Sequence, residues 1–158
     1  MTIKAGDKLP PGKLTVMGAE GPKPITTEEL FNGKKAVMFA VPGAFTPGCS
    51  RTHLPGFVVN ADQILAQGVD NIICVAVNDA FVMDAWGKAQ NAEKIIMAAD
   101  GNGDYTRALG LELDATGFGM GKRSKRYAMV VDDGKVAYLG VDDRDIDKSS
   151  AETVLKNL

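Results

Sequence analysis

Two continuous apolar runs stand out along the chain, KAVMFAV at 35–41 and NIICVAV at 71–77. Runs without alternating polar residues are typical of central strands in a parallel sheet that is covered on both faces. KIIMAA at 94–99 predicts a third, weaker strand. Between the first two runs, the segment 47–67 predicts a helix that ends at Gly68, because glycine suits a helix C-terminus.

Two shorter helices are predicted after the second and third apolar runs. Asn78 and Asp79 have side chains that can cap a helix N-terminus, and this helix should run to about Lys88. Asp104 begins a short helix that ends near Gly110. Strands and helices therefore alternate up to this point of the chain.

A hairpin and a last helix complete the pattern. RYAMVV at 126–131 and KVAYLGV at 135–141 flank a DDG turn, in which Gly134 can adopt a positive φ angle. Near the end of the chain, Ser149 and Glu152 have the spacing of a capping box and predict a final helix.

This order of elements predicts an α/β fold. A strand–helix–strand unit followed by an antiparallel hairpin implies a central mixed β-sheet flanked by helices on both faces. The chain has 158 residues and no repeat or linker, so residues 1–158 are expected to form a single domain. The order is compatible with a thioredoxin-like fold, although the hydrophobic pattern alone does not select it over other α/β folds.

Composition and charge limit which binding partners and which cellular compartment are expected. The net charge of −2 does not favour nucleic acid or an anionic membrane surface. No apolar run approaches the ~20 residues of a membrane span. The first residues, MTIKAGDKLPPGK, lack the apolar core of a signal peptide, so we expect a soluble, cytoplasmic protein. A transit peptide removed earlier would leave no trace in this sequence.

The cysteine count limits the chemistry further. Cys49 and Cys74 are the two cysteines, so the chain has neither a C-x-x-C motif nor a disulfide framework. With His53 as the single histidine, Cys and His cannot supply the four ligands of a structural zinc site, and we expect no metal. Cys74 lies in the middle of a predicted strand, and we expect it to be buried.

The segment VPGAFTPGCSRTHLPGF at 41–57 carries the candidate chemistry. Pro47 suits the first position of a helix, because its missing N–H would be unpaired there. Cys49 then lies in the first turn, where free N–H groups and the helix dipole favour a thiolate. Thr46 and the N–H of Gly48 are placed to orient an electrophile and to stabilise its leaving oxygen.

Each of these residues also has a purely structural interpretation. Cys49 could be an inert core thiol, Thr46 a plain N-cap, and Pro42 the end of a strand. His53 is more often a surface or packing residue than a base. The Pro-Gly pair at 55–56 predicts a kink in the helix.

The motif at this segment resembles a known family. Pro42, Thr46 and Cys49 stand as the P-x-x-x-T-x-x-C signature of peroxiredoxins, and the fuller stretch resembles the type II, or peroxiredoxin-five, subfamily. The blocks at 68–89 and 125–136 resemble the same subfamily, so the similarity covers nearly the whole chain.

The resemblance implies a thioredoxin-like fold and a thiol peroxidase without a cofactor. Cys49 would be the peroxidatic cysteine, which attacks the terminal oxygen of a hydroperoxide and becomes a sulfenic acid. Thr46 would hydrogen-bond the thiolate and the peroxide, and Pro42 would shield the site from water. The family's active-site arginine corresponds to Arg126, which can hold thiolate and peroxide without losing its own proton.

The chain departs from some relatives in how the sulfenic acid is resolved. Those relatives carry a second cysteine near the C-terminus, where this chain has serines. We therefore expect a one-cysteine mechanism with an external thiol, with glutathione or glutaredoxin favoured over thioredoxin. The subfamily also implies a homodimer.

Other interpretations stay open at this level. The basic cluster KRSKR at 122–126 predicts a solvated loop apart from Arg126, and Trp86 is most simply a packing residue. A thioredoxin-like binding or holdase protein with an inert Cys49 is the alternative from another functional class. A thiol–disulfide oxidoreductase is disfavoured by the missing C-x-x-C motif.

Overall fold

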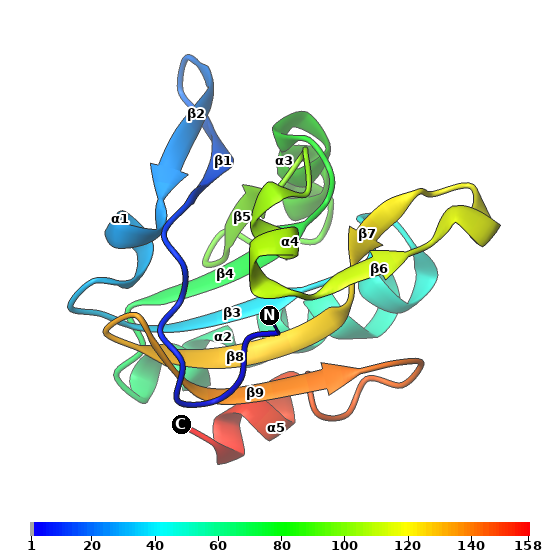
Figure 1. Cartoon of the computed structure of the whole chain (residues 1–158). Coiled ribbons are helices and arrows are strands. Elements are labelled where there is room, and N and C mark those ends of the chain that lie inside the picture. The colour runs from blue at the N-terminus through cyan, green and yellow to red at the C-terminus, as the bar shows by residue number, and fades with distance from the viewer. Residues whose placement is uncertain (1) are drawn as a thin grey trace.

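The computed structural model describes residues 2–158 and contains a seven-stranded mixed sheet (Figure 1). The three predicted apolar runs form neighbouring parallel strands, β3, β4 and β5, in the middle of this sheet. The order across the sheet is β2-β1-β5-β4-β3-β8-β9, and the remaining pairs are antiparallel. The strands are β1 (Lys13–Gly18), β2 (Gly21–Thr26), β3 (Lys35–Ala40), β4 (Asn71–Ala76), β5 (Ile96–Ala99), β8 (Arg126–Asp132) and β9 (Lys135–Asp142).

Helices cover both faces of the sheet, as predicted. Side chains alternate along a strand, so Val37 and Phe39 of β3 join one apolar cluster, while Ala36 and Met38 join the other. The first cluster is covered by α2, α3 and α5, and the second by α1 and α4. None of the helices within residues 2–158 is long and apolar enough to span a bilayer. The helices are α1 (Thr27–Phe31), α2 (Leu54–Ala66), α3 (Ala80–Ala89), α4 (Asp104–Leu109) and α5 (Ala151–Lys156).

Most local signals are confirmed, and one cap is wrong. The turn between β8 and β9 places Asp133 and Gly134 at φ angles of 49° and 78°, as the DDG sequence predicts. The side chain of Asp79 caps α3 by accepting the N–H of Val82. In α5, however, the cap is Ser150 rather than Ser149, because the Ser149 hydroxyl is bonded elsewhere.

The sequence pattern misses two hairpins, and the first consists of β1 and β2. Strand β2 has the sequence GPKPIT, and its two prolines argue against a strand, yet they are tolerated because β2 is an edge strand. The second is a small hairpin of β6 (Glu112–Asp114) and β7 (Lys122–Ser124), with the 3-10 helix η2 (Thr116–Phe118) at its tip.

The prediction of a solvated loop at 122–126 is therefore wrong in part. Residues 122–124 form β7, and the half-buried Arg123 donates hydrogen bonds to the carbonyls of Met120 and Val77 (2.9 and 3.1 Å). Lys122 and Lys125 are exposed, as predicted.

Candidate active site

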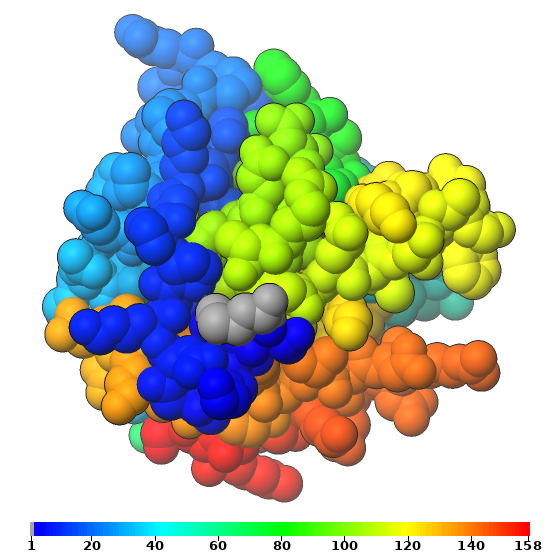
Figure 2. Space-filling view, viewed as in Figure 1, coloured from blue at the N-terminus to red at the C-terminus, as the bar shows by residue number. Residues whose placement is uncertain are grey.

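The site lies on the loop and helix that follow the central strand β3. The β6–β7 hairpin and the loop between β9 and α5 project on the same side of the molecule (Figures 1 and 2). Both lie against the segment that leads to Cys49: Met120 lies next to Gly43, and Ile146 lies next to Gly48. This arrangement surrounds Cys49 with parts of the chain that are distant in sequence.

The helix begins at Pro47, as its sequence predicts. Thr46 occupies the N-cap position, since its carbonyl accepts the N–H of Ser50 (2.9 Å). Its hydroxyl donates to the carbonyl of Gly43 (2.6 Å) and makes no hydrogen bond to a helix N–H in the described chain. The hydroxyl therefore closes the loop rather than capping the helix, which corrects the plain N-cap interpretation. The amide oxygen of Asn78 accepts the N–H of Ala44 (3.0 Å) and anchors the same loop.

The predicted kink at Pro55 takes the form of a π-helical turn, η1 (Cys49–His53), which precedes α2. Leu54 donates its N–H to the carbonyl of Cys49 rather than to that of Ser50. In a regular α-helix the ring of Pro55 would clash with the carbonyl four residues earlier, and the wider turn makes room for the ring.

Cys49 is fully buried, and a guanidinium reaches its sulfur. Arg126, the first residue of β8, donates from Nη2 to Cys49 Sγ over 3.2 Å. Gly48 lies beside the same nitrogen: a Cβ atom at that position would lie 3.4 Å from it, in ordinary van der Waals contact. The sulfur thus accepts a hydrogen bond from a donor that is charged at every working pH. The fold thus brings together Cys49 and Arg126, which are 77 residues apart.

His53 holds the other side of Arg126. Its Nδ1 lies 2.9 Å from Arg126 Nη1, and its Nε2 lies 2.8 Å from the carbonyl of Ser149. Since a guanidinium can only donate, Nδ1 accepts and the ring proton is on Nε2. Burial and the charge of Arg126 lower the pKa of His53 from 6.5 to about 4, so the ring is neutral near pH 7.

His53 was expected to be a surface or packing residue, and the packing part is confirmed. The ring is buried and lies 5.1 Å from the ring of Phe39 and 5.7 Å from that of Phe57. Its hydrogen bond to Arg126 was missed, because nothing in the local sequence indicates that residue 53 meets residue 126.

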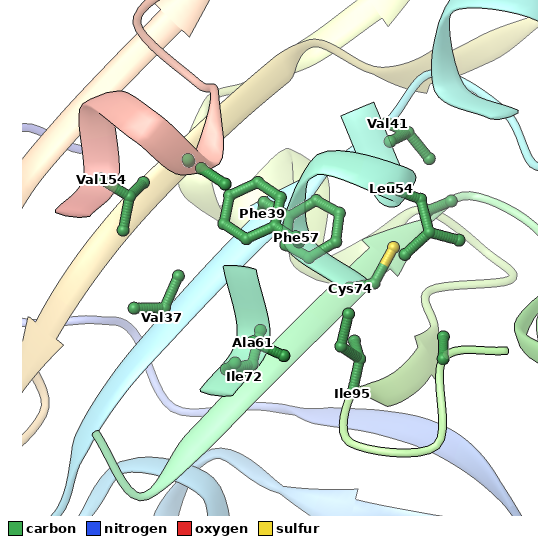
Figure 3. Close-up of a cluster of buried hydrophobic side chains, with 14 of the residues drawn as sticks. Val37, Phe39, Val41, Leu54, Phe57, Ala61, Ile72, Cys74, Ile95 and Val154 are labelled. Carbon is green, nitrogen blue, oxygen red and sulfur yellow. The ribbon is translucent and has the colours of Figure 1, made fainter. Parts of the chain in front are cut away.

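The second cysteine lies in the core. Cys74 is fully buried on β4, and Figure 3 shows it between Leu54 and Ile95. Burial raises the pKa of the Cys74 thiol well above its ordinary value, and the neighbouring Cys49 raises it further. Both cysteines are free thiols. The predicted burial of Cys74 is thus confirmed.

The remaining candidates lie around the same loop. Pro42 follows the end of β3 and is half-buried. Trp86 is fully buried, as a packing residue should be, and its indole N–H also donates to Ser50 Oγ over 3.0 Å. A cavity of about 500 Å³ lies elsewhere, between the β1–β2 hairpin and α3. Within residues 2–158, no group of three His, Cys, Asp or Glu side chains is arranged to hold a metal ion.

Comparison with known proteins relates this site to others. The Redoxin family model matches residues 4–155. The chain is 49% identical to peroxiredoxin-2E-2, chloroplastic, of Oryza sativa subsp. japonica, over 99% of this chain and 73% of that protein. The crystal structure of reduced Prx3 in complex with H2O2 from Vibrio vulnificus is 54% identical, with a TM-score of 0.94 and 98% of both chains covered.

Peroxiredoxin 5 from Alvinella pompejana is a further structural neighbour. It is 37% identical to this chain, with a TM-score of 0.86, and the comparison covers 98% of this chain and 97% of that one. These neighbours confirm the predicted thioredoxin-like α/β fold.

Proposed function

Because this chain belongs to the peroxiredoxin family, in its type II or peroxiredoxin-five-like subfamily, we propose that it reduces hydrogen peroxide and organic hydroperoxides at Cys49. Thiol-dependent peroxide reduction is the activity of the family. The observation that carries the assignment to Cys49 is the 3.2 Å hydrogen bond from Arg126 to its sulfur. The Vibrio vulnificus relative was crystallised with H2O2, which supports the choice of substrate.

In the proposed reaction, the Cys49 thiolate attacks the terminal oxygen of the hydroperoxide. An S–O bond forms while the O–O bond breaks, and the departing oxygen takes up a proton and leaves as water or alcohol. The sulfur becomes a sulfenic acid. Arg126 stabilises the charge that develops on the oxygens, since donors fixed in place are worth most where charge develops. The N–H of Gly48 supplies a further donor, and the Thr46 hydroxyl does so once it turns from the Gly43 carbonyl toward the peroxide. Pro42 keeps water away.

We propose that an external thiol resolves the sulfenic acid. A first thiol condenses with it to form a mixed disulfide and water, and a second thiol exchanges to release reduced Cys49. Cys74, the other cysteine of the chain, is fully buried, and its raised pKa keeps it protonated, so it is a poor nucleophile. No cofactor is required for these steps.

Turnover is expected to be faster with glutathione and glutaredoxin than with thioredoxin. A mixed disulfide with glutathione is a substrate that glutaredoxin can reduce, whereas thioredoxin would find no intramolecular disulfide. The measurement is NADPH consumption with hydrogen peroxide, coupled to glutathione reductase or thioredoxin reductase at matched reductant concentrations. Equal or faster turnover with thioredoxin would contradict this assignment of the reductant.

We further propose a homodimer that forms through the apolar side chains around the site. Phe45, Phe81 and Phe118 are 56%, 65% and 86% exposed, so their phenyl rings are available to an association surface. Phe45 belongs to the loop before Cys49, and its ring lies 6.4 Å from that of Trp86 on α3, the helix that also carries Phe81.

Replacing Phe81 by arginine is expected to weaken self-association at least about tenfold, because a charge would be buried in the interface. Sedimentation velocity over a range of concentrations measures this. The matched control is Val59→Arg on α2, at an apolar residue that is 78% exposed. A monomeric parent protein, or a dimer that Phe81→Arg leaves intact, would show that this surface is not the interface.

We propose a cytoplasmic location on the basis of the two free thiols, which are typical of a reducing compartment. The rice relative is named as chloroplastic, so a plastid stroma is the competing compartment. Cell fractionation with an antibody against the protein distinguishes the two.

A further inference from the structure

The contacts around His53 continue beyond Ser149 to a carboxylate on β9. Asp142 Oδ2 accepts the N–H of Ser149 (2.8 Å), the hydroxyl of Ser149 (2.6 Å) and the N–H of Asp147 (3.0 Å). Its Oδ1 accepts the N–H of Lys148 (3.1 Å). One carboxylate thus binds three consecutive residues, 147–149, of the segment that leads into α5.

The same segment is held from a second side. Tyr138 of β9 donates its hydroxyl to the carbonyl of Lys148 (2.7 Å), and the missing side chain at Gly140 leaves room for that carbonyl against the strand. Partial burial disfavours the charged form of Asp142, but the hydrogen bonds from Ser149, Asp147 and Lys148 lower its pKa below the ordinary value. The segment is therefore tied to an ionised carboxylate near pH 7.

The carbonyl of Ser149 is the group that decides the tautomer of His53. It accepts the Nε2 proton, and this leaves Nδ1 free to accept from Arg126. If the carbonyl moved away, the proton could shift to Nδ1, and Arg126 Nη1 would then face another donor. The position of a loop carbonyl therefore controls whether Arg126 is held toward Cys49.

We propose that Asp142 is a positioning residue of the peroxidase site, acting through the Ser149 carbonyl and the His53 tautomer to hold Arg126 on the Cys49 sulfur. This inference rests on the roles proposed above for Cys49 and Arg126. Asp142 itself makes no contact with the sulfur in the described structure; three residues, Ser149, His53 and Arg126, link it to the Cys49 sulfur.

The test is the Asp142→Asn variant. An amide has a single oxygen, so it cannot accept all four bonds, and in either orientation its NH2 group would face a backbone N–H of residues 147–149. The rate of Cys49 oxidation by hydrogen peroxide at neutral pH is expected to fall about tenfold, the lower end of what is lost when a group that orients an active-site residue is removed. Asp143→Asn is the matched control, since it makes the same change one residue along at an exposed side chain.

His53 supplies a readout that a purely structural role would not change. It is the single histidine of the chain, so its ring nitrogen NMR signals are unambiguous. In the parent protein they should report the Nε2–H tautomer and a pKa of about 4. In Asp142→Asn, both neutral tautomers should be populated, and the pKa should fall further, because the Asp142 charge and the hydrogen bond to the Ser149 carbonyl both raise it in the parent.

The pH dependence of the rate follows from that shift. The charged groups that act on His53 are Arg126 of β8 and Asp142 of β9, and Cys49 shares the guanidinium of Arg126 with it. A protonated His53 cannot accept from Arg126, but its pKa is about 4 in the parent and should be lower in the variant, so the ring stays neutral in both proteins and the variant should be slower by the same factor from about pH 7 to about pH 5.

The outcomes separate this inference from the proposed function. A parent protein that does not react with peroxide refutes the proposed function. With an active parent, a folded Asp142→Asn variant whose rate or whose His53 spectrum is unchanged overturns the positioning role alone. If that variant does not fold, Ser149→Ala removes only the hydroxyl bond to Asp142. The rate of Cys49 oxidation and the His53 spectrum of this second variant then decide whether Asp142 has the positioning role.

Discussion

Replacing Cys49 by serine is expected to abolish peroxide reduction, whereas replacing Cys74 by serine is expected to leave turnover close to that of the parent. A serine hydroxyl at position 49 cannot ionise near pH 7 and cannot form a sulfenic acid, so no covalent intermediate remains. Cys74 is fully buried in β4, and its raised pKa keeps it as the unreactive thiol. The two substitutions are matched, because each exchanges one buried sulfur for oxygen.

Steady-state turnover with glutathione and glutaredoxin measures how much peroxidase activity each variant loses. The intact mass of the protein identifies the covalent intermediate. After one equivalent of peroxide and glutathione, the parent should carry a single glutathione adduct on Cys49. A loss of two hydrogens, with Cys49 and Cys74 linked in the peptide map of the monomer, would make Cys74 the resolving cysteine. The one-cysteine mechanism would then be wrong.

Replacing Arg126 by glutamine is expected to slow the reaction of Cys49 with hydrogen peroxide by about 10²–10³. This is the usual cost of removing one fixed donor from a reacting centre. The amide has no charge with which to hold the thiolate, and it cannot reach both Cys49 and His53 with the two ends of a guanidinium fork. The unfolding temperature should move little, since Arg126 belongs to neither apolar cluster.

Stopped-flow fluorescence measures this rate, because the single tryptophan, Trp86, is hydrogen-bonded to Ser50 next to Cys49. The control is Lys125→Gln, which removes the same charge from the neighbouring, exposed residue. If Arg126→Gln reacts at the parent rate while Cys49→Ser is inactive, Cys49 is the nucleophile without help from Arg126.

Most of the sheet could be predicted from local patterns. The continuous apolar runs at 35–41 and 71–77 are the central parallel strands β3 and β4 because both of their faces are covered. Strand β2 was missed because it lies at the edge of the sheet rather than in its middle. An edge strand needs hydrogen bonds on one side only and tolerates the prolines that make its sequence look like a loop.

The helical start at Pro47 and the place of Cys49 in its first turns were also predictable, since a helix N-terminus depends on a few consecutive residues. The shape of that turn was not. Whether Pro55 kinks a helix or widens it into a π-turn depends on how α2 packs on the sheet, which a stretch of sequence does not contain.

The sequence by itself therefore determined the class of fold and the segment that carries the thiol, because both are written in neighbouring residues. The tertiary structure alone decided the electrostatics of that thiol. Arg126 comes from β8, which pairs with β3, and the carbonyl that orients His53 belongs to Ser149, which is held by hydrogen bonds to Asp142 of β9. It also decided that Cys74 is buried, and this burial, rather than the cysteine's own neighbours along the chain, raises its pKa.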